Sequence, residues 1–149
     1  MKLRCFPIAA VVALSVLSAA TLVATPAQAQ TAAAGCAQIE VQNVRPEQGM
    51  LMIAAYADAA SFKKSPVVAT QMRAGAATMT FALCGLTGTI VSLTLFQDLN
   101  GNGQLDANAF GIPSEPWGAS GKPAPMAGPT WEATAVPLDG STIVVKLSR

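Results

Sequence analysis

The sequence predicts an all-β fold, an antiparallel β-sandwich of the immunoglobulin-like or transthyretin-like type with about seven strands. Two observations support this class. Short runs rich in β-branched and aromatic residues alternate with turn-forming Gly, Pro, Asn and Asp residues, and no segment after the first thirty residues has the length and periodicity of a long helix. A small closed barrel is the alternative architecture for the same pattern.

Six segments are predicted as strands, each bounded by turn residues: 38–44, 49–58, 77–84, 89–97, 131–138 and 142–147. The strongest is 89–97, whose alternate residues separate cleanly into two faces. Residues 49–58 form a continuous apolar run, which is typical of a strand covered on both sides. Residues 59–75 are predicted as a crossover connection, because Pro66 stops any helix that begins there.

Residues 1–29 are expected to be a secretory signal peptide. Lys2 and Arg4 give a positive start, residues 6–24 are almost entirely apolar, and Ala27-Gln28-Ala29 is a small-x-small cleavage sequence. An uncleaved membrane anchor is the alternative, but Pro26 and the cleavage sequence follow the apolar stretch directly. We therefore expect an exported protein, periplasmic or secreted, without a membrane span after cleavage. Residues 30–36 should form a flexible tail and residues 37–149 a single domain.

The expected compartment decides how the cysteines are interpreted. Cys5 leaves with the leader, and Cys36 and Cys84 remain as an even pair in an oxidising compartment, where a disulfide is expected. It would stabilise the fold by about 4 kcal/mol on the chain-entropy model. The sequence before Cys36 also resembles a lipoprotein cleavage box, but Ala33 stands where that box has Leu, and the apolar stretch ends too early.

Composition excludes several functions. Without the leader the chain has seven Lys and Arg against eight Asp and Glu, so it carries no basic excess and a nucleic-acid partner is not expected. The absence of histidine removes Ser-His-Asp and Cys-His catalysis and histidine zinc sites. Asp98, Asp106 and Glu115 could in principle act as paired carboxylates in glycoside hydrolysis, but a cation explains their clustering better. We therefore expect no catalytic residues and no enzyme.

Residues 98–106, Asp-Leu-Asn-Gly-Asn-Gly-Gln-Leu-Asp, have the spacing of a calcium loop, with Gly103 at the tight turn. The predicted ligands are oxygen atoms of Asp98, Asn100, Asn102, Gln104 (through its carbonyl), Asp106 and, folding back on the loop, Glu115. Oxygen-only ligands suit calcium rather than zinc or copper.

The loop also departs from the helix–loop–helix pattern. Ala109 stands where a bidentate glutamate is usual, and a strand enters the loop instead of a helix. We therefore expect a structural calcium ion bound weakly, with Kd ~0.1–1 mM, and Asn108 as a second candidate to complete the shell. The alternative is a metal-free turn that caps its own amides with Asn and Asp oxygens.

Residues 99–130 form a long Gly- and Pro-rich connection without periodicity, and connections of this length are usually functional or held by something else. Trp117 lies within it and Trp131 directly after it. Together with Tyr56 they could stack against a sugar or another small ligand, although tryptophans in such loops more often pack the loop onto the sandwich.

Several motifs resemble those of a bacterial family. The segment Phe96-Gln-Asp-Leu-Asn-Gly-Asn-Gly-Gln-Leu-Asp106, then Phe110-Gly-Ile-Pro-Ser-Glu-Pro-Trp-Gly118, with Gly-Leu-Thr-Gly-Thr at 85–89 and Gly-Pro-Thr-Trp-Glu-Ala at 128–133, resembles the signature of domain-of-unknown-function family 2141. The resemblance extends over about residues 39–147. It implies a small exported β-sandwich and no established reaction. The chain departs from the family at Gln97, where histidine is usual, and at 119–121, where Ala-Ser-Gly replaces Phe-Ser-Asn.

The function predicted from these features is an exported, non-enzymatic β-sandwich module with a calcium-stabilised loop and a binding or structural role. The alternative is a carbohydrate- or small-ligand-binding protein that uses the aromatic residues of the loop. The partner is unknown, with an envelope protein or a glycan as the candidates.

Overall fold

A computed structural model describes residues 35–124 and 128–148 of the chain. The expected signal peptide, 1–29, and most of the expected tail, 30–36, lie outside these residues. Among the described residues no helix is both long enough and apolar enough to cross a membrane.

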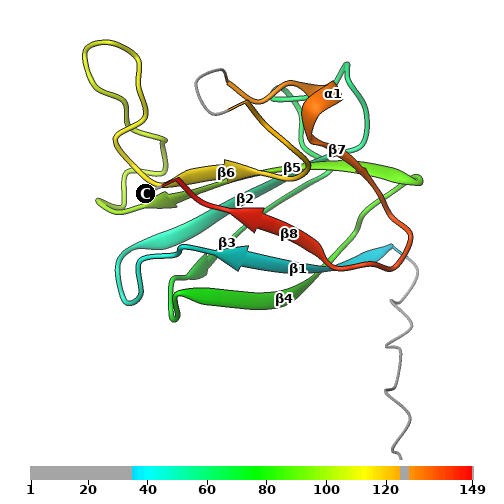
Figure 1. Cartoon of the computed structure of the whole chain (residues 1–149), viewed down its shortest axis with the longest axis horizontal. Helices are drawn as coiled ribbons and strands as arrows, with labels where there is room; N and C mark the ends of the chain where they lie inside the picture. The colour runs from blue at the N-terminus through cyan, green and yellow to red at the C-terminus, as the bar shows by residue number, and fades with distance from the viewer. Residues whose placement is uncertain (1–34, 125–127, 149) are drawn as a thin grey trace, which may run out of the picture.

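The described residues form eight strands and one short helix, arranged as two facing sheets (Figure 1). The three-stranded sheet has the order β4 (Thr78–Cys84), β1 (Cys36–Gln42), β8 (Ile143–Lys146). The five-stranded sheet has the order β3 (Val68–Arg73), β2 (Met50–Tyr56), β5 (Ile90–Asp98), β6 (Trp117–Ala119), and β7 (Ala135–Pro137) also pairs with β5. The predicted β-sandwich is confirmed. Its strand pairs are antiparallel except β1 with β8, which is parallel.

The core lies between the two sheets and follows from the alternation of the strands. Ile39 and Val41 of β1 are fully buried, as are Leu51 of β2 and Leu93 of β5, and the residues between them face outward. Because successive side chains of a strand point to opposite faces, this alternation fixes which face meets the other sheet.

The predicted disulfide between Cys36 and Cys84 is present and joins β1 to β4 at directly opposite positions of the ladder. It spans 48 positions of sequence, so it closes a large loop at one end of the three-stranded sheet. β1 therefore begins at Cys36, one residue before the expected start of the domain.

The structure corrects the sequence prediction in three places. Residues 59–75, predicted as a crossover connection, contain the edge strand β3, in which only Val68 and Met72 pack against the core. Residues 131–138, predicted as one strand, begin with helix α1 (Trp131–Thr134), because the side chain of Thr130 caps its first turn, and only β7 continues as strand. The connection 99–130 contains β6, which is too short to show a period in the sequence.

Both β6 and β7 pair with the same edge of β5. β6 lies opposite residues 94–96 and β7 opposite residues 90–92, and the Ser120 N–H donates to the Leu93 carbonyl oxygen between them (3.0 Å). Gly118 is required in β6, because a Cβ there would lie 2.6 Å from the Lys146 carbonyl oxygen of β8. The long connection is thus anchored to β5 where it returns to the sheet.

Candidate functional site

The loop that begins at Asp98 is closed at its base by Glu115. One carboxylate oxygen of Glu115 accepts a hydrogen bond from the Leu99 N–H (2.7 Å), and the other accepts from the Asp106 N–H (3.1 Å). The side chain is only 6% exposed, so both bonds are shielded from water. A single buried carboxylate therefore ties together the two ends of the predicted calcium loop.

Asp98 organises the first half of the loop. Its Oδ1 accepts from the amides of Gly101 (2.7 Å) and Asn102 (3.2 Å), and its Oδ2 accepts from Gly103 (2.7 Å). Gly103 has φ +74°, the left-handed conformation predicted for the tight turn. Burial raises the pKa of the Asp98 carboxyl, but the loop amides that donate to it, Gly103 first, outweigh burial, and the pKa lies below its ordinary value of 3.8.

Asp106 organises the second half. Its carboxylate accepts from the side-chain amide of Asn100 (2.6 Å) and from that of Asn102 (3.1 Å to each oxygen). The oxygen of the Asn102 side chain accepts from the Gln104 N–H (2.8 Å), which continues the network along the backbone. The structure thus brings together four of the five predicted side-chain ligands, Asp98, Asn100, Asn102 and Asp106, in one hydrogen-bonded network. The fifth, Glu115, is bonded to the backbone at the base of the loop.

The donor set of this loop fits a hard cation. Asp98 Oδ2 and Asp106 Oδ1 each accept one hydrogen bond and keep a second lone pair. Asp98 Oδ1 and Asp106 Oδ2 each accept two, so a cation bound to these oxygens would have to displace an amide donor. Among the described residues no group of three or more Asp, Glu, Cys or His side chains is arranged to hold a metal, so the asparagine oxygens would have to complete any shell. In the geometry described, the carboxylates cap backbone and side-chain amides.

Asn108 does not join this network. Its side-chain oxygen accepts from the N–H groups of Phe110 (3.0 Å) and Ile112 (3.1 Å) and closes a small hairpin in which Ala107 bridges Pro113. The hairpin projects Phe110 into solvent with 88% of its surface exposed.

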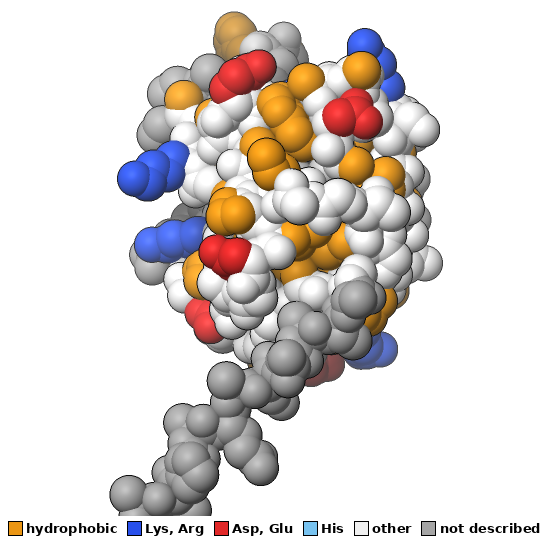
Figure 2. All heavy atoms as spheres, turned by 90° about the vertical axis from the view of Figure 1, so that its right-hand side faces the viewer, with side chains coloured by type: hydrophobic (Ala, Val, Ile, Leu, Met, Phe, Trp, Pro, Cys, Tyr) orange, Lys and Arg blue, Asp and Glu red, His pale blue; other side chains and the backbone are white. Residues whose placement is uncertain are grey.

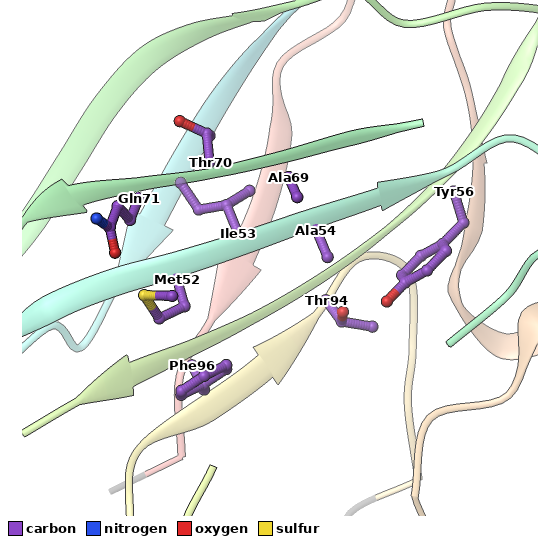
Figure 3. A pocket seen from close by; sticks show the side chains of 9 residues that line it. All are labelled: Met52, Ile53, Ala54, Tyr56, Ala69, Thr70, Gln71, Thr94 and Phe96. Carbon is purple, nitrogen blue, oxygen red and sulfur yellow. The ribbon is translucent and has the colours of Figure 1, made fainter. Parts of the chain in front are cut away.

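A second candidate site lies on the outer face of the five-stranded sheet, where β2, β3 and β5 form a groove with a volume of about 510 Å³ (Figure 3). Its lining residues are Met52, Ile53, Ala54, Tyr56, Ala69, Thr70, Gln71, Thr94 and Phe96. An adjoining hollow of about 260 Å³ shares Thr94 and Phe96 with the groove and continues along Leu105 and Trp117 to Lys63.

The calcium-like loop and the groove meet at one cross-strand pair. Trp117 of β6 lies opposite Phe96 of β5. Phe96 precedes Asp98, where the loop begins, by two residues, and Trp117 follows Glu115, where the loop closes, by two residues. The Gln97 N–H donates to the Pro116 carbonyl oxygen (2.8 Å) beside this pair. The closure of the loop therefore sets the register that holds Trp117 next to Phe96.

The two tryptophans lie on different elements and have different neighbours. Trp117 lines the hollow, whereas Trp131 of α1 stacks edge-on against Phe62 (ring centroids 6.2 Å apart), and Phe62 stacks in the same way on Tyr56 (5.2 Å). In the molecular surface seen from the right-hand side of Figure 1, hydrophobic side chains form several separate patches (Figure 2). Tyr56 connects the aromatic stack with the groove, because it belongs to both.

Sequence reasoning missed Phe96, Met52 and Lys63 as site residues. The signal for the first two was present, because outward-facing positions of an antiparallel strand should be polar if they meet water. β2 is apolar on this face, and β5 places Phe96 there after the polar Ser92 and Thr94. No sequence pattern indicates that Lys63 lies beside β5, whose residues that line the hollow are more than thirty positions further along the chain. Gln97 faces inward and holds the turn at residues 45–48 through three hydrogen bonds of 2.6–2.9 Å.

Three buried hydroxyl groups form a further polar cluster. Thr134 donates to the Thr130 carbonyl oxygen (2.7 Å) and is bonded to Ser92 (2.6 Å), and Ser120 donates to the Thr134 carbonyl oxygen (2.5 Å). Each hydroxyl is used to join α1 and the end of β6 to β5. We interpret the cluster as a structural contact between these elements.

The fold and its two candidate sites define a class: a small disulfide-linked β-sandwich with an Asp- and Asn-rich loop beside an apolar groove. Within this class the chain belongs to the family described as "Uncharacterized protein conserved in bacteria", domain-of-unknown-function family 2141, whose model matches residues 39–146. The predicted family is thereby confirmed. Neither the curated proteins nor the solved structures contain a match to the chain.

Proposed function

We propose that this protein is an exported, non-enzymatic binding module of the periplasm or the extracellular space. In this proposal a calcium ion stabilises the loop of residues 98–116, and the loop holds Trp117 against Phe96 at the edge of a ligand-binding groove. The observation that carries the proposal is the meeting of Asp98, Asn100, Asn102 and Asp106 in one network at the spacing of a calcium loop.

Calcium would act here as a structural ion. Oxygen atoms of Asp98, Asn100, Asn102, Asp106 and the Gln104 carbonyl would hold it, with Glu115 closing the base of the loop. Its charge would offset the repulsion between the carboxylates that the loop concentrates. Because the loop starts and ends beside the Phe96–Trp117 pair, binding would order one wall of the hollow lined by these residues.

The groove supports the binding role. Ligand sites are typically concave and mainly apolar, enclose ~300–1,000 Å³ and carry few polar groups. The groove on β2, β3 and β5 has about 510 Å³ and is lined by five apolar side chains and four with polar groups, those of Tyr56, Thr70, Gln71 and Thr94. A small-ligand-binding role is therefore favoured over a carbohydrate platform built from both tryptophans, because Trp131 packs against Phe62 instead.

Calorimetric titration of the processed protein with calcium tests the structural ion. We expect binding with Kd of about 0.1–1 mM. At ~10 mM calcium this affinity would stabilise the fold by about 1.4–2.7 kcal/mol, measured as a higher melting temperature. Asp106→Asn should weaken both effects, because it removes one of the three negative charges of the loop, and Asp139→Asn, in a turn outside the loop, should leave them unchanged. Equal responses of the two variants, or no calcium heat, would refute the proposal.

A further inference from the structure

We propose that the groove on the outer face of the five-stranded sheet binds an anionic amphiphile, a molecule with an unbranched apolar chain and a carboxylate head. The apolar chain would lie along Met52, Ala54 and Phe96, and the carboxylate would meet Lys63. This inference rests on the ligand-binding role proposed above and names the class of ligand.

The groove and the adjoining hollow form one apolar path. They share Thr94 and Phe96, so a chain-like ligand can run from the β2–β3 side of the groove toward Trp117 without leaving the surface. Met52 contributes a flexible, polarizable side chain that adapts to chains of different shape. The close-up of the groove shows Met52 and Phe96 side by side and Tyr56 at the other end (Figure 3).

Lys63 places one positive charge on the wall of the hollow. It lines the hollow together with Leu105, Trp117 and Pro129, and no Asp or Glu lines either the hollow or the groove. Among residues 35–124 and 128–148 one ion pair is present, Arg73 with Glu47 (3.5 Å), so Lys63 has no carboxylate partner in the described part of the chain. Its ammonium lies 5.7 Å from the centroid of the Phe62 ring. An anionic head group would complement this charge.

The backbone at Lys63 adds an independent observation. Lys63 has φ +58°, a left-handed conformation that Gly or Asn adopts more easily than Lys. The turn around it is held firmly, since Asp58 Oδ1 accepts from the Ser61 N–H (2.8 Å) and the Lys64 N–H donates to the Ser61 carbonyl oxygen (2.9 Å). Strained backbone kept at a defined position is found most often at functional sites. Here it fixes the start of the one cationic side chain that lines the path.

The polar groups of the path select an amphiphile rather than a sugar. A sugar needs hydrogen-bonding partners for several hydroxyl groups, whereas five of the nine lining side chains offer only carbon and sulfur atoms: Met52, Ile53, Ala54, Ala69 and Phe96. A neutral apolar ligand would leave the Lys63 charge unused at the edge of an apolar surface. A carboxylate on an apolar chain matches both parts.

Titration of the processed protein with octanoate, decanoate and dodecanoate, each below its micelle-forming concentration, tests the proposal, with Trp fluorescence as the readout. We expect affinity to rise about two- to fourfold with each added methylene, as partial to full burial of a methylene predicts. Decanol and decylamine serve as the neutral and cationic probes of the same length. Decanoate should bind about tenfold more tightly than decanol, and decylamine most weakly.

Two variants locate the head group and the chain. Lys63→Gln should lower the affinity for decanoate about tenfold and leave decanol unchanged, whereas Lys64→Gln, the same charge change at the next residue, should have no effect. Ala69→Phe, at an exposed position of the edge strand, should fill the groove and weaken binding of both probes. If decanol binds as tightly as decanoate, or the two lysine variants behave alike, the carboxylate preference is refuted although the groove still binds. If none of the probes binds, the ligand-binding role itself is refuted.

Discussion

The buried carboxylate of Glu115 gives the sharpest test of how the long loop is held. Glu115→Gln keeps the size and shape of the side chain but replaces one carboxylate oxygen with an NH₂ group. Glu115 accepts from two backbone amides, those of Leu99 and Asp106, so in either orientation of the glutamine one of these N–H groups faces a donor instead of an acceptor. A buried donor without an acceptor costs about 1–3 kcal/mol.

Urea unfolding followed by tryptophan fluorescence measures this loss. With m of about 1.5 kcal/mol/M, the midpoint should fall by roughly 0.7–2 M. Glu132→Gln is the matched control, because it makes the same chemical change at an exposed position and should stay within about 0.5 kcal/mol of the unchanged protein. If Glu115→Gln is as stable as this control, the two hydrogen bonds do not hold the loop and the reasoning is wrong.

Two further predictions concern the loop and β6. The pKa of Asp98 is lowered in the folded state, so the unfolded chain takes up the proton first on acidification. The ionised Asp98 carboxylate therefore stabilises the fold above pH 3.8, its ordinary pKa, and this stabilisation is lost as the pH falls through the lower pKa of the folded state. The urea midpoint, measured at decreasing pH, should fall as this stabilisation is lost, and it should fall less in Asp98→Asn. An equal fall in both proteins would contradict the prediction. Gly118→Ala should destabilise the fold by about 1–3 kcal/mol, because its Cβ would meet the Lys146 carbonyl oxygen, whereas Gly75→Ala, in open space, should be neutral in the same urea assay. Equal stability of the two alanine variants would show that β6 and β8 adjust freely.

The sequence was sufficient where local pattern decides structure. Hydrophobic pattern located the strands that became β1, β2, β4 and β5: alternation in three of them and a continuous apolar run in β2. The spacing of Asp98, Asn100, Asn102 and Asp106 predicted residues that the structure brings together. Two cysteines in a chain that the sequence predicts to be exported were enough to predict the disulfide.

The tertiary structure decided what depends on pairing between distant segments. β3 and β6 have little hydrophobic pattern of their own and exist because β2 and β5 offer them free edges. The same pairing sets Trp117 against Phe96, and the fold brings Lys63 to the hollow that both of them line, although these residues are far apart in the sequence. Local alternation shows which side of a strand is apolar, but only the register between strands determines which side chains become neighbours. For this protein the sequence by itself determined the β-sandwich and the calcium-like loop, and the packing of the sheets determined the groove beside it.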